Sequence, residues 1–183
     1  MYINTDIDVN HVEFEGRVSW GRTVPQNDVD EDGNGHGTHC AGTVGLRKCV
    51  AMALNLIAVK VLGSNGSGTM ADVVGGVLWA ATAKAEYTAT GKTKHKGSVA
   101  NMSLSGSKSL ALDDAVNKTV ESGIHFAVAA GNDNRDTCSY SPAAAENAVT
   151  VGASTLGYDR AYFPNYGQCV DVFAPGERSH STP

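Results

Sequence analysis

One segment of the chain surrounds a histidine with small residues and is the first place to look for chemistry. The run from Asp32 to Thr43 reads Asp-Gly-Asn-Gly-His-Gly-Thr-His-Cys-Ala-Gly-Thr. Glycines on both sides of His36 permit a tight entry into a helix and the close approach of a substrate. Histidine serves both proton transfer and metal binding. The run is therefore a candidate reactive site.

Metal binding is the weaker interpretation of this segment. His36, His39 and Cys40 offer two imidazoles and a thiol, but their spacing matches no zinc signature and the second half of such a site is missing. Cys40 is better explained as a small buried thiol, because cysteine is often buried. We therefore expect no metal at His36.

The elements around this segment alternate between strands and helices. Short β-branched runs predict buried strands, and helical spacing of apolar residues predicts helices between them. The predicted strands are 57–62, 99–104, 124–129 and 148–151, and the predicted helices are 70–87 and 112–120. This alternation predicts an α/β fold with a parallel sheet. Ligands of such sheets gather at the carboxyl ends of strands, so the loops after Leu62, Leu104 and Ala130 should carry the function.

Composition excludes several classes of protein. The 183 residues are 42% hydrophobic and 18% charged, which suits one folded domain rather than a disordered chain. A formal charge of −5 gives no basic surface for nucleic acid. The apolar runs, such as 126–130, are too short to cross a membrane. We therefore expect neither nucleic acid nor a membrane as a partner.

Further short motifs follow the histidine segment in a fixed order. They are Lys60-Val61-Leu62, Asn65-Gly66-Ser67-Gly68, Asn101-Met102-Ser103-Leu104, Ala129-Ala130-Gly131-Asn132, Tyr140-Ser141-Pro142-Ala143, Val151-Gly152-Ala153-Ser154, Asn165-Tyr166-Gly167 and Phe173-Ala174-Pro175-Gly176. With these motifs the sequence resembles the subtilisin-like serine proteases, and among them the proteinase K branch. Residues 13–17 and 97–104 resemble fungal vacuolar proteases of the cerevisin type most closely. The resemblance implies a subtilisin-like three-layer α/β fold with a mainly parallel sheet.

The resemblance also implies roles for individual residues. His36 matches the general base, and Asn132 matches the side chain that donates to the developing oxyanion. The implied substrate-binding positions form an edge that pairs with the peptide backbone. They also form two walls of the pocket that binds the residue before the cleaved bond. They are Gly66, Ser67 and Gly68 for the edge, and Ser103, Leu104, Ser105, Gly106, Ala129, Ala130 and Gly131 for the walls. Ser105 departs from the family, which usually has glycine there.

The catalytic aspartate is where the pattern breaks. The family has Asp-Thr-Gly, and the aligned residues here are Asn4, Thr5 and Asp6. An amide at position 4 cannot stabilise an imidazolium as a carboxylate does, and such a change cost about 10⁴ in rate in a serine protease. In a strand, Asp6 would project from the same face as Asn4 but be displaced along it. We do not expect Asp6 to substitute.

The nucleophile motif of the family, Gly-Thr-Ser-Met-Ala, does not occur in these residues. By resemblance, 1–183 is a partial catalytic domain, truncated at both ends, without the prodomain and without the segment that carries the serine. We expect a serine endopeptidase in the intact parent and an inactive chain as given. Two alternatives stay open: a non-catalytic relative that only binds peptides, and a fungal allergen fragment bound by IgE.

The resemblance further implies a structural calcium ion, with no cofactor required for the chemistry. Two backbone carbonyls and one carboxylate, from Glu146, Ala148 and Asp171, match the ligands, although Asp171 suits a solvated loop equally well. Cys138 and Cys169 flank this region and are expected to form a disulfide, which fits a vacuolar or secreted protein. Expected partners are peptide or protein substrates, with the parent a monomer inhibited by its own prodomain.

Overall fold

The computed structural model describes residues 2–4, 6–45, 54–89 and 97–176. The described residues form two compact units, an amino-terminal unit within residues 2–89 and a carboxy-terminal unit within residues 97–176. Among the described residues, no helix combines the length and apolar character needed to cross a membrane.

The amino-terminal unit contains three parallel strands. These are β1 (Tyr2–Asn4), β2 (Val18–Thr23) and β3 (Leu56–Lys60), in the order β2-β3-β1, with Val18 opposite Leu56 and Tyr2 opposite Ala58. A short 3₁₀ turn, η1 (Val12–Phe14), precedes β2. The hydrophobic pattern predicted β3, whereas β2 was missed because its sequence Val-Ser-Trp-Gly-Arg-Thr is largely polar.

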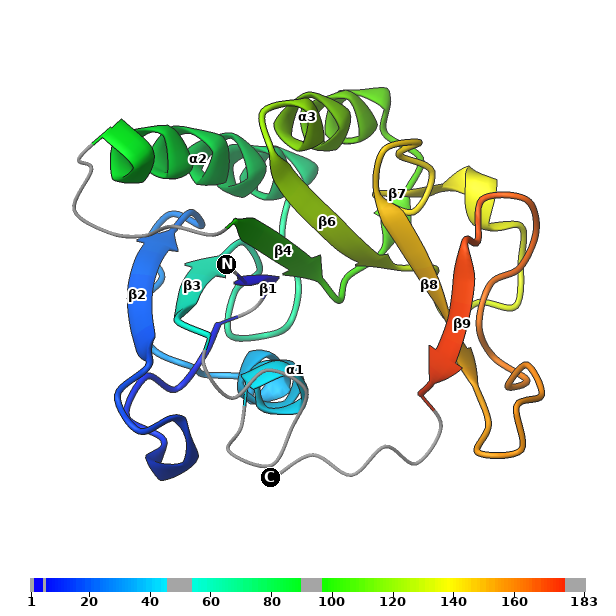
Figure 1. Cartoon of the computed structure of the whole chain (residues 1–183), viewed down its shortest axis with the longest axis horizontal. Coiled ribbons are helices and arrows are strands. Elements are labelled where there is room, and N and C mark those ends of the chain that lie inside the picture. The colour runs from blue at the N-terminus through cyan, green and yellow to red at the C-terminus, as the bar shows by residue number, and fades with distance from the viewer. Residues whose placement is uncertain (1, 5, 46–53, 90–96, 177–183) are drawn as a thin grey trace. The chain divides into compact units, whose positions relative to one another are not determined.

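Two helices cover opposite faces of these strands (Figure 1). On one face, Ala41 of α1 (His36–Gly45) packs in a buried cluster with Leu56 and Ala58. On the other face, α2 (Met70–Ala89) brings Trp79 so close to Gly21 that an added Cβ would lie 2.7 Å from the indole. Thr69 and Asp72 cap α2 reciprocally, which starts the helix where the sequence predicted it.

The carboxy-terminal unit contains a parallel sheet and a small antiparallel pair. The sheet has the order β4-β6-β8-β9, formed by β4 (Ser98–Met102), β6 (Ile124–Ala129), β8 (Val149–Ser154) and β9 (Val172–Pro175). The pair consists of β5 (Gly106–Ser107) and β7 (Tyr140–Ser141), and a 3₁₀ turn, η2 (Thr137–Ser139), precedes β7. Strands β4, β6 and β8 match predicted strands. Strand β9 was missed because it is only four residues long and ends in a proline.

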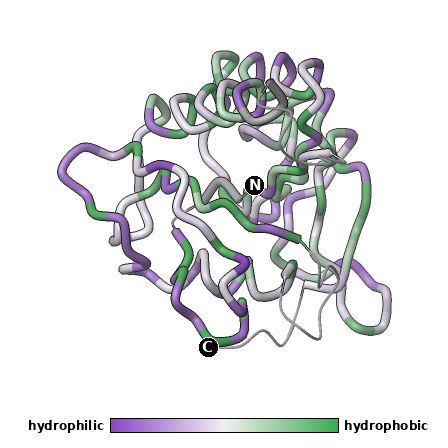
Figure 2. The backbone as a smooth tube through the Cα atoms, turned by 60° about the vertical axis from the view of Figure 1, so that its left-hand side comes forward, coloured by the Kyte–Doolittle hydropathy of each residue, from purple (hydrophilic) through white to green (hydrophobic). Residues whose placement is uncertain are grey.

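Helix α3 (Leu110–Glu121) connects β4 to β6 and lies beside β6 (Figure 1). Ser109 caps its first turn by accepting from the Leu112 amide at 3.3 Å, and Gly123, with φ 93°, ends it as predicted. Leu112 and Val116 are buried on its inner face. Hydrophobic and hydrophilic positions alternate along the helices, as expected for helices with one buried face (Figure 2). The observed architecture confirms the predicted α/β class.

Candidate active site

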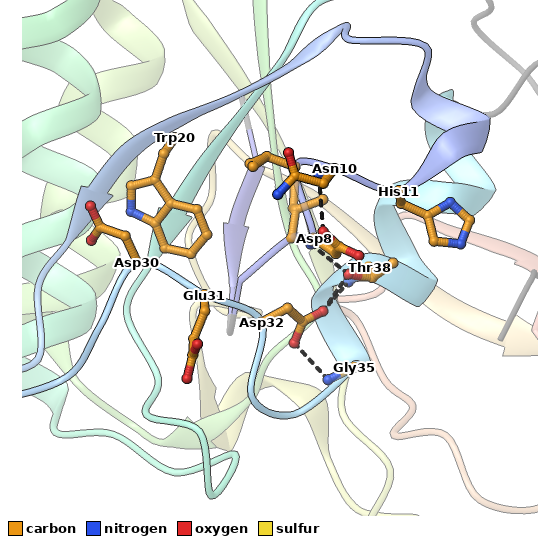
Figure 3. Close-up of a pocket in the computed structure, with 11 residues that line it drawn as sticks. Asp8, Asn10, His11, Trp20, Asp30, Glu31, Asp32, Gly35 and Thr38 are labelled. Atoms are coloured by element: carbon orange, nitrogen blue, oxygen red, sulfur yellow. Dashed lines mark hydrogen bonds between the residues drawn. The ribbon is translucent and has the colours of Figure 1, made fainter.

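His36 is the first residue of α1, and the half-buried carboxylate of Asp32 holds the turn that presents it. Asp32 accepts from the Gly35 amide at 2.6 Å and the Asn34 amide at 3.1 Å. It also accepts from the Thr38 amide and hydroxyl (Figure 3). These donors include amides at the helix start that have no partner within the helix. Asp32 therefore fixes the backbone around an exposed histidine.

The His36 side chain has a sulfur neighbour one helical turn along. Its Nε2 lies 3.7 Å from the Sγ of Cys40, which shares the same face of α1 at a spacing of four residues. Cys40 was expected from the sequence to be buried, but the structure shows it half-buried. Because of this contact, a reagent that modifies the thiol would also affect the space beside the imidazole.

Behind the histidine turn lies a buried ionic cluster centred on Lys60, which the sequence did not reveal. The Lys60 Nζ is 3.2 Å from Asp6 Oδ2 and 3.0 Å from Asp28 Oδ1, and the Lys60 side chain is fully buried. The carbonyls of Val29 and Glu31 accept from the same ammonium at 3.3 and 3.0 Å. The cluster therefore ties the end of β3 to the segment that leads into α1.

Asp6 and Asp32 form a coupled pair within this region. Burial raises the pKa of Asp6 to about 6, the neighbouring Asp32 adds to the rise, and Lys60 opposes it. Burial also acts to raise the pKa of Asp32, but hydrogen bonds from Asp6, Thr38 and backbone amides outweigh it and lower that pKa to about 2. Asp6 Oδ1 is buried without a hydrogen-bond partner, which agrees with a carboxyl whose charged form is disfavoured by burial.

Replacing Asp6 with asparagine should flatten the dependence of stability on pH. A folded-state pKa above the ordinary 3.8 means that folding takes up a proton, so stability falls as pH rises from about 4 through about 6. Compared with the unsubstituted chain, the free energy of unfolding of Asp6→Asn should rise by about 2 kcal/mol between pH 4.5 and 7. The measurement is urea unfolding at several pH values, followed by tryptophan fluorescence, since Trp20 and Trp79 both lie in the amino-terminal unit.

The exposed carboxylate Glu13 supplies the control for this experiment, because Glu13→Gln removes a charge without touching the buried pair. Its stability should keep the pH dependence of the parent protein. Equal slopes for Asp6→Asn and the parent between pH 4.5 and 7 would show that Asp6 is not protonated by folding.

A cavity of about 390 Å³ opens beside the same turn (Figure 3). Its lining includes Trp20, Asp30 and Glu31 together with Asp32 and Thr38 of the histidine turn. None of the residues predicted from the sequence to bind substrate lines it. The cavity is therefore an additional feature of the amino-terminal unit.

The predicted edge for the peptide lies in the amino-terminal unit, after β3. Gly63 N donates to the Ser67 carbonyl at 2.8 Å, and Gly66 has a left-handed φ of 78°. Residues Gly66, Ser67 and Gly68 are exposed. This places their backbone where an extended peptide can reach it.

The two predicted walls of the pocket lie together in the carboxy-terminal unit. Strands β4 and β6 are parallel neighbours with Met102 opposite Val128, so Ser103–Gly106 and Ala129–Gly131 leave the sheet at the same edge. A Cβ added to Gly131 would lie 3.0 Å from the Ser105 hydroxyl oxygen. The serine that replaces the family's glycine therefore stands directly against the opposite wall.

Asn132 follows Gly131 and is exposed. Gly131 has φ 97°, a left-handed conformation that side chains other than glycine rarely adopt. His36 belongs to the amino-terminal unit, and Asn132 belongs to the carboxy-terminal unit. For Asn4 the strand backbone is described, but its side chain lies outside the described part of the structure.

The predicted disulfide and calcium ligands also lie in the carboxy-terminal unit. Cys138 and Cys169 are joined by a disulfide. The Asp171 carboxylate accepts from the Thr150 amide at 2.7 Å, which orients it, and Glu146 is exposed. Two carbonyl oxygens and one carboxylate are an all-oxygen set that fits Ca²⁺.

Comparison with known proteins shows the family to which the chain belongs. The model of the subtilase family matches residues 2–183. A subtilisin-like serine protease of Penicillium rubens, Pen ch 18, is 64% identical over 181 residues, which cover 98% of this chain and 37% of that protein. Alkaline protease 2 of Aspergillus fumigatus is 63% identical over 185 residues, again covering 98% of this chain and 37% of that protein.

A solved structure, that of a cold-adapted subtilisin-like serine proteinase, superimposes with a TM-score of 0.87 at 45% sequence identity. The match covers 98% of this chain and 63% of that one. The chain therefore spans little more than a third of the length of the fungal relatives and under two thirds of the solved structure.

Proposed function

Because this chain belongs to the subtilase family of serine proteases, we propose that it supplies the general base and the oxyanion donor of a serine endopeptidase. The observation that carries the proposal is the exposed His36 at the first turn of α1, held there by Asp32. An exposed imidazole on a fixed turn can reach a substrate and a nucleophile without rearrangement of the backbone.

In the proposed reaction, a serine from sequence outside these 183 residues attacks the peptide carbonyl carbon. His36 takes the hydroxyl proton as the C–O bond forms, and Asn132 donates to the oxyanion of the tetrahedral intermediate. Collapse of the intermediate breaks the C–N bond, and His36 returns the proton to the leaving amine. Water then hydrolyses the acyl-enzyme by the same steps, so no cofactor is consumed.

We propose peptide or protein substrates bound in an extended form. By family resemblance, Gly66–Gly68 and Ser103–Gly106 provide two edges that pair with the peptide by β-strand addition, and Gly66–Gly68 are exposed as this requires. The hydroxyl of Ser105 against Gly131 narrows the pocket between the walls, which favours small side chains before the cleaved bond.

The test supplies the missing serine. The 183-residue chain alone should neither hydrolyse fluorogenic peptides nor react with a serine-directed phosphonate, since it lacks the nucleophile motif. A chimera is then made in which residues 2–183 replace the matched segment of the Penicillium rubens protease. With Asn4→Asp it should hydrolyse peptides, and with Asn4 it should be slower by about 10⁴.

His36→Ala in the Asn4→Asp chimera is the control, because it removes only the base. Activity that survives this substitution, or a folded Asn4→Asp chimera without activity, would contradict the proposed function.

A non-catalytic peptide-binding protein is the second candidate, favoured by Asn4 in place of the aspartate. It predicts that the chain binds a peptide without cleaving it. It also predicts that the chimera gains nothing from Asn4→Asp. The two candidates are therefore separated by the same pair of proteins.

We further propose a structural calcium ion held by the carbonyls of Glu146 and Ala148 and by the Asp171 carboxylate. Its support is the all-oxygen donor set and the orientation of Asp171 by Thr150. The ion would stabilise the loops before β8 and β9 and take no part in the chemistry.

The Cys138–Cys169 disulfide supports a vacuolar or secreted location, because disulfides persist in oxidising compartments. By family resemblance the parent is a monomer inhibited by its own prodomain. Recognition by IgE is proposed on the same resemblance to fungal proteases, and IgE binding to the purified chain tests it.

A further inference from the structure

The motif Asn165-Tyr166-Gly167 has no role in the reaction described above, although its first residue is fully buried. Asn165 lies between β8 and β9 in the carboxy-terminal unit. Its side chain reaches the loop that follows β6, which is the loop that carries Asn132.

Asn165 makes hydrogen bonds on both sides of Asn132. Its Nδ2 donates to the Ala130 carbonyl at 2.9 Å, and its backbone amide donates to the Gly131 carbonyl at 2.9 Å. Its Oδ1 accepts from the Asp133 amide at 3.0 Å and from the Arg135 amide at 3.1 Å. The backbone is thus held two residues before, one residue before and one residue after Asn132.

These contacts require a side chain that donates and accepts at once. An aliphatic residue of similar size would leave the Ala130 carbonyl and two amides without their partner, which is costly in a buried position. Gly131 also packs directly on the amide, because an added Cβ would lie 2.4 Å from Asn165 Nδ2. Gly131 is therefore required at this position both by its left-handed φ and by the close packing of the Asn165 amide.

The rest of the loop after β6 is held by backbone hydrogen bonds that do not involve the Asn165 side chain. Asn134 N donates to the Phe163 carbonyl at 2.9 Å, Tyr166 N to the Arg135 carbonyl at 2.9 Å, and Thr137 N to the Tyr166 carbonyl at 2.8 Å. Loss of the Asn165 side chain should therefore loosen the backbone around Asn132 without unfolding the loop.

We propose that Asn165 is a positioning residue that holds the backbone on both sides of Asn132 and so aims the Asn132 side chain at the oxyanion. Asn132 is exposed, so its direction is set by the backbone that carries it. This inference rests on the proposed function, because the oxyanion role of Asn132 is part of it.

The first test measures kcat and KM in the active Asn4→Asp chimera. Asn165→Ala should lower kcat at least tenfold with KM within about threefold, because the intermediate loses its donor while substrate binding keeps both edges. Asn117→Ala is the matched control. Its Oδ1 accepts from the Asn147 amide at 2.9 Å, so it also holds a loop through an amide, but away from Asn132.

A double-mutant cycle separates positioning from a general structural effect. In the Asn132→Ala background, Asn165→Ala should lower kcat by no more than about twofold, because Asn165 acts through a side chain that is no longer there. Multiplicative losses, an effect on KM alone, or a loss equal to that of Asn117→Ala would overturn the proposal.

A second test uses the 183-residue chain and does not depend on activity. Asn165→Ala should speed hydrogen exchange of the Asp133 and Arg135 amides at least tenfold, and leave the Thr137 amide unchanged. Unchanged exchange at Asp133 would overturn the proposal even if the chimera is inactive. If exchange at Asp133 and Arg135 becomes faster but the chimera is inactive, the positioning role of Asn165 stands and the proposed function is wrong.

Discussion

Replacing Lys60 with methionine should destabilise the amino-terminal unit by about 3–5 kcal/mol. The ammonium is fully buried and is the shared partner of Asp6 and Asp28. Burial works against its charge, but Asp28 and Asp6 more than compensate and raise the pKa of Lys60. Methionine fills a similar volume, so the expected loss comes from two carboxylates and two carbonyls that lose their donor rather than from a void.

Urea unfolding monitored by tryptophan fluorescence measures this loss, because both tryptophans report on the unit that contains Lys60. Arg22→Met is the matched control. It removes a cation from the neighbouring strand β2, where the side chain is exposed, and should cost less than about 1 kcal/mol.

If Lys60→Met does not fold, the double variant Lys60→Met/Asp6→Gly keeps the prediction testable. The second substitution removes a buried carboxylate that has lost its cation, and it introduces the glycine expected from the family pattern. The double variant should therefore recover part of the lost stability. A single variant as stable as Arg22→Met would show that the cluster contributes little. The same would follow from a double variant less stable than Lys60→Met.

The sequence predicted those parts of the fold that depend on local pattern. Helix α2 begins after Thr69 because a reciprocal cap lies there, and α3 ends at Gly123 because a left-handed residue is needed. Strands β3, β4 and β6 are short runs made mostly of apolar residues, several of them β-branched, which is the pattern that predicts strands. Strand β9 was harder to predict, because its run Val172–Pro175 is only four residues long and ends in a proline, which argues against a strand in the sequence.

For the candidate site, the sequence indicates residues only where a motif carries them. His36 and Asn132 stand in motifs that resemble those of the family, and their roles remain predictions. The role of Lys60 was not visible, because its partners Asp6 and Asp28 lie 54 and 32 positions away and a lysine is usually exposed to solvent. Asn165 stands in a recognised motif, but its contacts were not visible in the sequence for the same reason. Its partners belong to a loop about thirty positions earlier, and only the folded chain brings them together.

Removing the Cys138–Cys169 disulfide should destabilise the carboxy-terminal unit by about 3–4 kcal/mol. The two cysteines are 31 positions apart, and cross-linking a loop of that length removes entropy of this size from the unfolded chain. Cys138→Ser/Cys169→Ser, compared with the parent in urea unfolding followed by circular dichroism, measures the loss. Cys40→Ser is the control for replacing a thiol by a hydroxyl.

The loop closed by this disulfide contains Asn165, so the bridge and the buried amide can be tested against each other. Backbone bonds from Asn134, Tyr166 and Thr137 already join the same two segments in the folded state. The bridge should therefore act mainly on the unfolded chain, and its removal should leave hydrogen exchange at Asp133 slow under native conditions. A double serine variant as stable as the parent would contradict the predicted loss. Fast exchange at Asp133 in a variant that remains folded would instead show that the disulfide, together with Asn165, holds the backbone around Asn132.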